Sequence, residues 1–133
     1  MKQQTKDRVE EFVTEYLRCK NDFEYFATKY VYLELAGGDE IYKPYKKQLE
    51  FINQLEKEKH LIVLKTRQTG ISTTTQAYCA WLLNFHDNTV VGVLSKDGKE
   101  STDFSRAIRS MIEKFPSWLT PKKGKEGGCF DKK

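Results

Sequence analysis

The chain has 133 residues, of which 38% are hydrophobic and 32% charged, and this length predicts one small globular domain and excludes a multi-domain enzyme. The formal net charge is +4, of which +3 comes from residues 121–133, so residues 1–120 are nearly neutral. Charge alone therefore does not favour a general electrostatic binder of nucleic acid. The aromatic content of 13% argues against disorder.

The cysteines and the apolar runs predict a soluble intracellular protein. Cys19, Cys79 and Cys129 are far apart and none is paired at a metal-ligand spacing, so we expect reduced thiols. No apolar run approaches the roughly 20 residues needed to cross a bilayer. The N-terminus lacks the apolar core of a signal peptide.

The first 60 residues are predicted to be mainly helical. A first helix carries one apolar face, with Thr5 as its cap, formed by Val9, Phe12, Val13, Tyr16 and Leu17. Asn21 or Asp22 is expected to cap a short second helix that extends to Tyr30. Extended chain at 31–33, a turn at 37–39, and a third helix that Pro44 begins are expected next.

The middle of the chain changes character. Two short apolar runs, 61–64 and 89–95, are typical of strands covered on both faces. Helical spacing follows each run, over 72–85 and over 104–115, and in the first of these helices Ala77, Tyr78, Trp81 and Phe85 are expected to form one stripe. This order predicts an α/β fold with a parallel sheet and flanking helices, preceded by an N-terminal helical segment.

Three parts are predicted along the chain. Residues 1–58 form a helical segment, and residues 59–120 form the α/β core. Residues 121–133 are rich in Lys and Gly and lack apolar periodicity, so a basic, disordered tail is expected there.

The segment 65–73, Lys-Thr-Arg-Gln-Thr-Gly-Ile-Ser-Thr, lies between the first predicted strand and the following helix. Backbone N–H groups at such a helix start converge on an anion, and the helix dipole favours negative charge there. On the usual G-x-x-x-x-G-K-[ST] pattern, Gly70 is the second glycine and Ser72 the hydroxyl that binds Mg²⁺. Ile71 occupies the lysine position, and Lys65 occupies that of the first glycine.

Because both ends of such a loop lie close to the phosphates, we expect Lys65 to replace the missing lysine. Arg67 would supply a second cation near the γ phosphate, where charge develops during transfer. The alternative is that Gly70 is only a turn, Ser72 a helix cap and Lys65 a solvated strand end.

A second group of candidate residues surrounds the start of the third helix. Gln48 offers a donor and an acceptor to an adenine edge, and Tyr42 or Tyr45 can stack on the base. Alternatively, these tyrosines belong to the core face of the helix.

Together these segments resemble the N-terminal ATPase region of the large terminase subunit of tailed bacteriophages, from about Val9 to Leu119. The segments that carry the resemblance are Cys19-Lys20-Asn21-Asp22, Tyr25-Phe26, Tyr30-Val31-Tyr32, the Tyr45/Gln48 pair and residues 65–72. In that family the protein is the motor that uses ATP to translocate viral DNA into procapsids.

The resemblance implies a partial P-loop NTPase fold, with an adenine motif in residues 1–58 and the first part of the ATPase core in residues 59–120. It also implies ATP and Mg²⁺ as cofactors and Arg67 as a cis-acting arginine finger, with Lys65 beside it in the catalytic set. The residues expected to bind the cofactor are Tyr45, Gln48, Lys65, Gln68, Thr69, Gly70, Ile71, Ser72 and Thr73, with Ser72 also at the metal. Implied partners are double-stranded viral DNA, the portal protein, the small terminase subunit and, at full length, copies in a ring. Localisation in the host cell cytoplasm follows, with no membrane partner.

Three parts of that family's machinery are not found here, namely the acidic strand end with its catalytic Glu, the coupling motif and the nuclease. Asp97 follows the second predicted strand but is better explained as a turn or cap residue. Glu34 precedes the phosphate loop, which is the wrong chain order. We therefore expect nucleotide binding without efficient hydrolysis by this chain alone.

Two other functions stay open. The chain could be the first piece of a helicase-like ATPase, which also pairs an adenine-reading Gln with a phosphate loop. It could instead be a non-catalytic module that docks a partner and carries a vestigial loop. The Gly127-Gly128-Cys129 segment could mark an arbitrary end, a broken gene or the edge of an intein.

Overall fold

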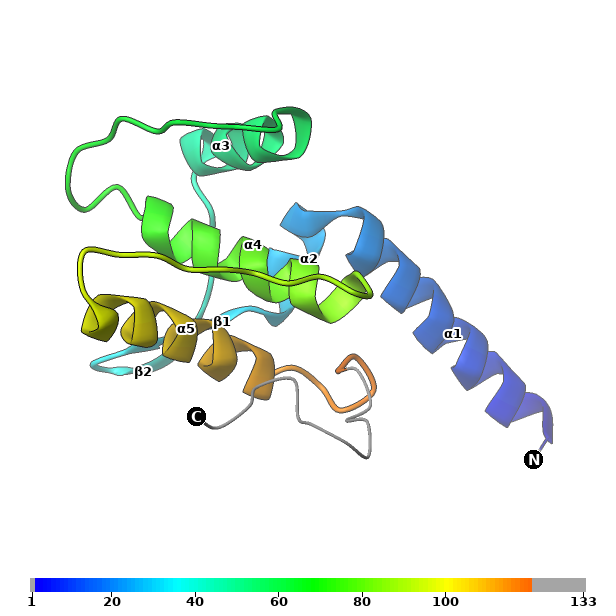
Figure 1. Cartoon of the computed structure of the whole chain (residues 1–133). Coiled ribbons are helices and arrows are strands. Elements are labelled where there is room, and N and C mark those ends of the chain that lie inside the picture. Colours follow the sequence, from blue (N-terminus) through cyan, green and yellow to red (C-terminus); the bar gives the residue numbers. More distant parts are fainter. Residues whose placement is uncertain (1, 121–133) are drawn as a thin grey trace.

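The computed structural model describes residues 2–120, and the predicted tail at 121–133 lies outside the described residues. The elements in chain order are α1 (Lys2–Asn21), α2 (Phe23–Tyr30), β1 (Tyr32–Leu35), β2 (Gly38–Ile41), α3 (Lys46–Lys57), α4 (Ile71–Phe85) and α5 (Gly98–Glu113) (Figure 1). The described part is therefore mostly helical. The single sheet in these residues is an antiparallel hairpin of β1 and β2.

The predicted α/β fold with a parallel sheet is wrong. Residues 61–64 and 89–95 form no strand, and their backbone groups make no backbone hydrogen bond within residues 2–120. A strand requires a partner, and apolar runs identify chain suited to a sheet without supplying one. Both segments lie in irregular connections, each of which runs back along the molecule from the end of one helix to the start of the next. Helices α3, α4 and α5 therefore run in the same direction (Figure 1).

Several apolar side chains of these two runs are exposed to solvent, unlike those of a buried strand. Ile62 and Leu64 are 98% and 101% exposed, and Val90 and Leu94 are 93% and 99% exposed. The residues between them, such as Val63 and Val91, are less exposed. Val91 packs against the core, whereas all four residues of the run 61–64 are exposed.

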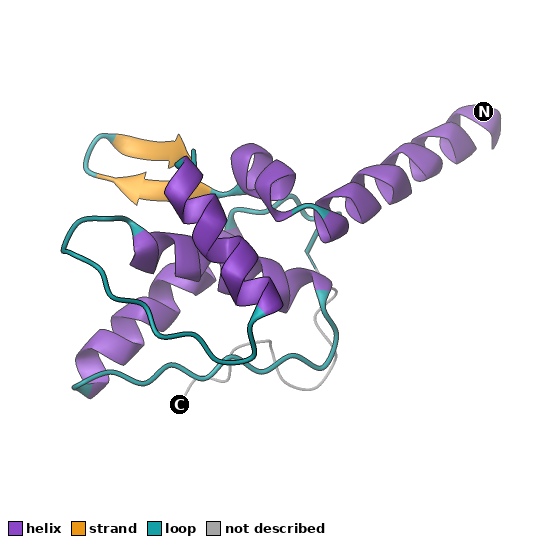
Figure 2. Ribbon diagram, turned by 90° about the horizontal axis from the view of Figure 1, so that it is seen from above, coloured by secondary structure: helices purple, strands orange, loops and turns teal. Residues whose placement is uncertain are grey.

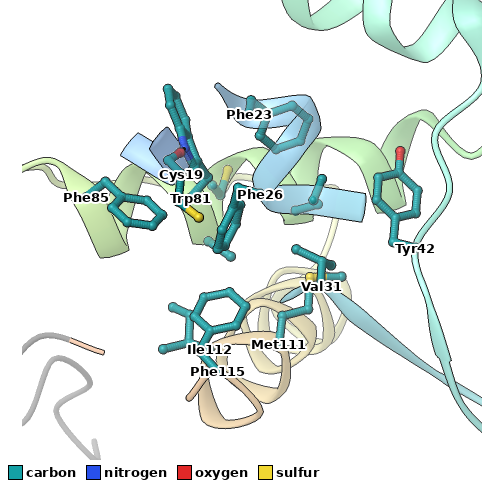
Figure 3. Close-up of a cluster of buried hydrophobic side chains, with 14 of the residues drawn as sticks. Cys19, Phe23, Phe26, Val31, Tyr42, Trp81, Phe85, Met111, Ile112 and Phe115 are labelled. Atoms are coloured by element: carbon teal, nitrogen blue, oxygen red, sulfur yellow. The ribbon is translucent and has the colours of Figure 1, made fainter. Parts of the chain in front are cut away.

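Helices α2, α4 and α5 build the core instead of a sheet (Figure 3). The ring of Phe26 lies at its centre, with its centroid 5.1 Å from those of both Phe85 and Phe115 in edge-to-face contacts. The stripe predicted for the helix at 72–85 faces the core, because Ala77, Trp81 and Phe85 are buried and Tyr78 is partly buried against them. Edge-to-face aromatic pairs add to the stabilisation from burial.

Two predicted helix caps are confirmed. The carboxylate of Asp22 accepts from the backbone N–H of Tyr25 at the start of α2, and Asp97 accepts from that of Glu100 at the start of α5. Asp97 is thus a cap, as expected from the residue types. Two other helix starts were predicted wrongly.

Thr5 lies inside α1, which begins three residues earlier at Lys2. Pro44 precedes α3, whose N-cap is Tyr45. In α3 the side chain of Gln48 accepts from the backbone N–H of the cap residue, so the hydrogen bond that fixes the start comes from the third helical residue. Proline favours a helix start without fixing its position.

Helix α1 projects from the rest of the molecule, and its C-terminal end lies against α2 (Figure 2). The carboxylate of Glu15 joins the two helices, because it accepts from Tyr30 at 2.7 Å and pairs with Lys29 at 2.6 Å. The indole N–H of Trp81 donates to the Cys19 carbonyl, 2.8 Å away, and so ties α1 to α4.

The hairpin of β1 and β2 positions Tyr42, which lies at the centre of the candidate site. Leu35 pairs with Gly38 across a turn at residues 36–37, and Gly38 has a φ of 120°, which favours glycine. The sequence predicted extended chain at 31–33 but not the second strand. After β2, the N–H of Tyr42 donates to the Val31 carbonyl at 2.8 Å, and the Tyr42 side chain is buried.

Candidate functional site: an anion-binding loop at the start of α4

Helix α4 begins without a side-chain cap. Its N-cap residue is Gly70, with a φ of 70°, and no side chain accepts from the first turn. The backbone N–H groups of Ile71, Ser72 and Thr73 have no acceptor within residues 2–120. Unpaired donors at the positive end of a helix dipole are the groups through which helix N-termini bind anions, so the start of α4 is a candidate anion site.

Residues 65–73, here called the anion loop, carry two cations on the approach to α4. Lys65 and Arg67 are exposed, and neither forms an ion pair or hydrogen bond with another described residue. Gln68 has a φ of 62°, which is uncommon for a residue with a side chain. The turn at Arg67 and Gln68 therefore directs the chain back toward the helix start.

Gln48 joins the start of α3 to the anion loop. Its Oε1 accepts from the Tyr45 N–H at 2.9 Å and lies 3.1 Å from the Tyr42 hydroxyl. Its Nε2 donates to the Thr69 carbonyl at 3.1 Å. The side chain is buried, so these contacts fix the last residue before Gly70 against α3.

Gly70 leaves no room for a side chain. A Cβ built there would collide with Nε2 of Gln48, and the positive φ would be strained in any other residue. The residue type at this position is therefore set by two independent requirements. The first requirement arises because the Gln48 amide packs directly against the loop, and the second from the backbone conformation alone.

A cleft of about 470 Å³, here called the hairpin cleft, opens beside this contact. It lies between the hairpin and the starts of α3 and α4, and its lining is Leu33, Leu35, Glu40, Ile41, Tyr42, Lys43, Tyr45, Gln48, Gly70 and Thr73. Its lining combines apolar side chains with polar and charged ones, and polar groups in a small-ligand site orient the ligand. The volume is within the range of such sites.

The cleft unites some of the predicted site residues and not others. Tyr45, Gln48, Gly70 and Thr73 all line it, although they come from two separate parts of the sequence. The remaining predicted residues lie outside its lining; they are Lys65, Arg67, Gln68, Thr69, Ile71 and Ser72. The anion loop is therefore adjacent to the cleft, and its cations face solvent.

Tyr45 and Gln48 occupy contrasting environments. Tyr45 is 75% exposed at the rim, so it does not belong to the core face of α3, and its ring is available to a flat ligand. Gln48 is 5% exposed and already uses its amide for contacts within the protein. The adenine-reading role of Gln48 stays a prediction.

Three features of the site were missed from the sequence. Lys43 lines the cleft and has no ion pair within residues 2–120. Thr74 is fully buried, and its hydroxyl lies 2.6 Å from that of Tyr42. The hairpin forms one wall. The sequence feature that could have pointed to Lys43 as a site residue is its place in a Lys-Pro pair between a strand and a helix start.

Burial raises the pKa of the Tyr42 phenol above its usual value, although the hydrogen bond with Thr74 acts in the opposite direction. The phenol therefore keeps its proton near neutral pH. A protonated Tyr42 can donate to Gln48, which makes this residue a fixed part of the site.

The described residues include no group of three or more His, Cys, Asp or Glu side chains that could hold a metal ion. Mg²⁺ bound with a nucleotide takes most of its ligands from phosphate and water. In P-loop sites the protein ligands are a Ser or Thr hydroxyl and an acidic side chain, and Ser72, the exposed second residue of α4, offers the hydroxyl.

Across residues 2–120, no helix combines the length and apolar character needed to span a membrane. Comparison of the whole chain with models of known protein families found no match.

Proposed function

We propose that this chain binds ATP through the anion loop and is the nucleotide-binding N-terminal part of a viral DNA-packaging motor, a terminase large subunit. The observation that carries the proposal is the uncapped start of α4, where three backbone donors lie unpaired at the end of a loop that carries Lys65 and Arg67. Free donors and free cations together favour a polyphosphate over a neutral ligand.

The hairpin cleft supports a ligand larger than phosphate. It adjoins Gly70 and offers apolar walls and the exposed Tyr45 ring, which suit a nucleobase. The triphosphate would lie along the anion loop, with Mg²⁺ between phosphate oxygens and the Ser72 hydroxyl. Arg67 would contact the γ phosphate as an arginine finger.

The role in packaging rests on the resemblance of Tyr45, Gln48 and residues 65–72 to terminase motifs. In this proposal the chain acts in the host cell cytoplasm within a full-length motor. That motor engages double-stranded viral DNA, the portal protein and the small terminase subunit and assembles as a ring. This chain contributes nucleotide binding, and efficient hydrolysis requires acidic groups beyond those recognised in its sequence.

Titration calorimetry with a non-hydrolysable ATP analogue and Mg²⁺ tests the proposal. We expect weak, saturable binding that Lys65→Ala abolishes. Lys59→Ala is the matched control, because Lys59 is also an exposed lysine in the connection between α3 and α4. Equal affinity in the two variants would show that the assignment of Lys65 is wrong.

A second candidate is a partner-docking module with a vestigial loop. One observation favours it, an apolar groove of about 270 Å³ along the projecting α1, with Trp118 on its other side. The groove residues Phe12 and Leu17 are 46% and 49% exposed. No heat of binding for the nucleotide analogue would favour this candidate.

A further inference from the structure

The orientation of the Gln48 amide is fixed by its partners. The Tyr45 backbone N–H can only donate, and the Thr69 carbonyl can only accept. Oε1 must therefore face Tyr45, and Nε2 must face Thr69. The reverse orientation would place the amide N–H against the Tyr45 N–H, and the amide oxygen against the Thr69 carbonyl oxygen.

A chain of hydroxyl groups lies next to Oε1 of Gln48. The Tyr42 hydroxyl lies 3.1 Å from Oε1 of Gln48 and 2.6 Å from Oγ1 of Thr74. Each hydroxyl has one hydrogen, and the Thr74 hydroxyl also lies 2.9 Å from the Gly70 carbonyl, so two arrangements fit these distances. In the first, Thr74 donates to Gly70 and Tyr42 donates to Thr74, which leaves Oε1 with the Tyr45 N–H alone. In the second, Thr74 donates to Tyr42 and Tyr42 donates to Gln48, while the Gly70 carbonyl still accepts from the Thr74 backbone N–H at 2.9 Å.

In the second arrangement Oε1 of Gln48 has two donors, which is its ordinary capacity. A residue that reads an adenine edge needs a free acceptor for the amino group and a free donor for a ring nitrogen. In that arrangement Gln48 keeps one unused N–H and no unused acceptor. Its other N–H is bound to the anion loop at Thr69.

We infer that the second arrangement holds, that Gln48 is a positioning residue for the anion loop, oriented by Tyr42 and Thr74, and that it does not read the nucleobase. The inference rests on the proposed function and assigns Gln48 to the phosphate end of the ligand. By holding Thr69 and packing against Gly70, Gln48 orients the first turn of α4 before an anion binds. Preorganised donors bind more tightly because less ordering is needed on association.

If Gln48 orders the anion loop without contacting the base, it affects the affinity for polyphosphates as a class. Any polyphosphate that reaches the three free N–H groups benefits from the ordered loop, with or without a base. Removing the amide should therefore weaken tripolyphosphate and ATP by the same factor. A base-reading role predicts weaker ATP binding and unchanged tripolyphosphate binding.

The experiment measures the affinities of ATP and tripolyphosphate by calorimetry for the wild-type chain, Gln48→Ala and Tyr42→Phe. We expect Gln48→Ala to lower the affinity for both ligands by on the order of tenfold. Tyr42→Phe should lower both affinities by about threefold, because it removes one of the hydrogen bonds that hold Gln48 in place. Tyr42→Phe keeps the buried ring and removes one hydroxyl. It tests the same idea if Gln48→Ala does not fold.

Tyr45→Ala is the matched control, because its exposed ring can contact a base while its backbone N–H is retained. We expect this variant to weaken ATP and leave tripolyphosphate unchanged. A loss confined to ATP in Gln48→Ala and Tyr42→Phe would overturn the inference alone. Absence of binding of both ligands to the wild-type chain would overturn the proposed function and the inference with it.

Discussion

The indole nitrogen of Trp81 in α4 lies 2.8 Å from the carbonyl oxygen of Cys19 in α1, and both residues are buried. This hydrogen bond joins positions 62 residues apart in the sequence. It connects the helix that begins at the anion loop with the projecting helix. The packing that supports the candidate site therefore includes the N-terminal segment.

Trp81→Phe should lower the free energy of unfolding by about 1–3 kcal/mol, because it removes the donor to a buried carbonyl and part of a buried ring. Urea denaturation followed by circular dichroism measures the change. Trp118→Phe is the control, since Trp118 is 36% exposed and has no hydrogen bond in residues 2–120. Equal losses in the two variants would contradict a specific role for the Trp81 contact.

Leu64→Ala and Leu119→Ala form a matched pair that tests the corrected fold. Leu64 is 101% exposed and Leu119 is 1% exposed. We expect a change within about 0.5 kcal/mol for Leu64→Ala and a loss of about 2–5 kcal/mol for Leu119→Ala. Denaturant unfolding measures both. A large loss for Leu64→Ala would support the buried strand that the sequence predicted.

The contribution of Glu15 to stability should depend on pH. Burial raises its pKa, but the hydrogen bonds from Lys29, Tyr30 and Tyr25 together outweigh burial, so its pKa lies below its ordinary value. A carboxylate with a lowered folded-state pKa stabilises the protein above its unfolded-state pKa. That contribution is lost as pH falls through the folded-state value.

Glu15→Gln should therefore cost about 1 kcal/mol at pH 7, and this cost should shrink as the pH falls below 4.5 and the wild-type carboxyl takes up its proton. The measurement is the difference in unfolding free energy between the variant and wild type as a function of pH. Glu24→Gln, an exposed acid in α2, is the control. A cost for Glu15→Gln that does not change with pH would argue against the charged network.

Gly70→Ala should destabilise the chain and abolish anion binding, because the new Cβ would meet Gln48 in a strained backbone conformation. We expect a loss of about 1–3 kcal/mol. Gly92→Ala is the control, since a Cβ there meets nothing within 4 Å. In a Gln48→Ala background, Gly70→Ala should lower the free energy of unfolding by less, because only the strain of the positive φ remains. An unchanged loss would exclude the predicted clash with Gln48.

Local signals in the sequence predicted the helices well. Asp22 and Asp97 were identified as caps because a short acid before an apolar periodic run satisfies the first helical N–H groups. The stripe of Ala77, Trp81 and Phe85 followed from helical spacing alone. These features depend on residues within one or two turns of each other.

The strands could not be predicted in the same way. The runs at 61–64 and 89–95 have strand composition, but pairing depends on partners elsewhere in the chain, and the structure leaves their backbone groups unpaired within residues 2–120. The hairpin was missed for the opposite reason. Its second strand, Gly38–Ile41, contains Asp39 and Glu40 and has weak strand propensity, although the register with β1 is complete.

The candidate site was predictable in part. The spacing of Gly70 and Ser72 located the helix start, and Tyr45 and Gln48 were expected near the same ligand. The bond between Gln48 and Thr69 spans 21 positions and depends on how α3 packs on α4, so no local pattern encodes it. The buried Thr74 partner of Tyr42 was hidden for the same reason.

The most direct test of the anion loop is a titration of ¹⁵N-labelled chain with tripolyphosphate, followed by amide chemical shifts. The account predicts saturable shifts concentrated at the N–H groups of Ile71, Ser72 and Thr73, lost in Lys65→Ala and retained in Lys59→Ala. Unmoved amides at the start of α4, with shifts spread over lysines elsewhere, would contradict it.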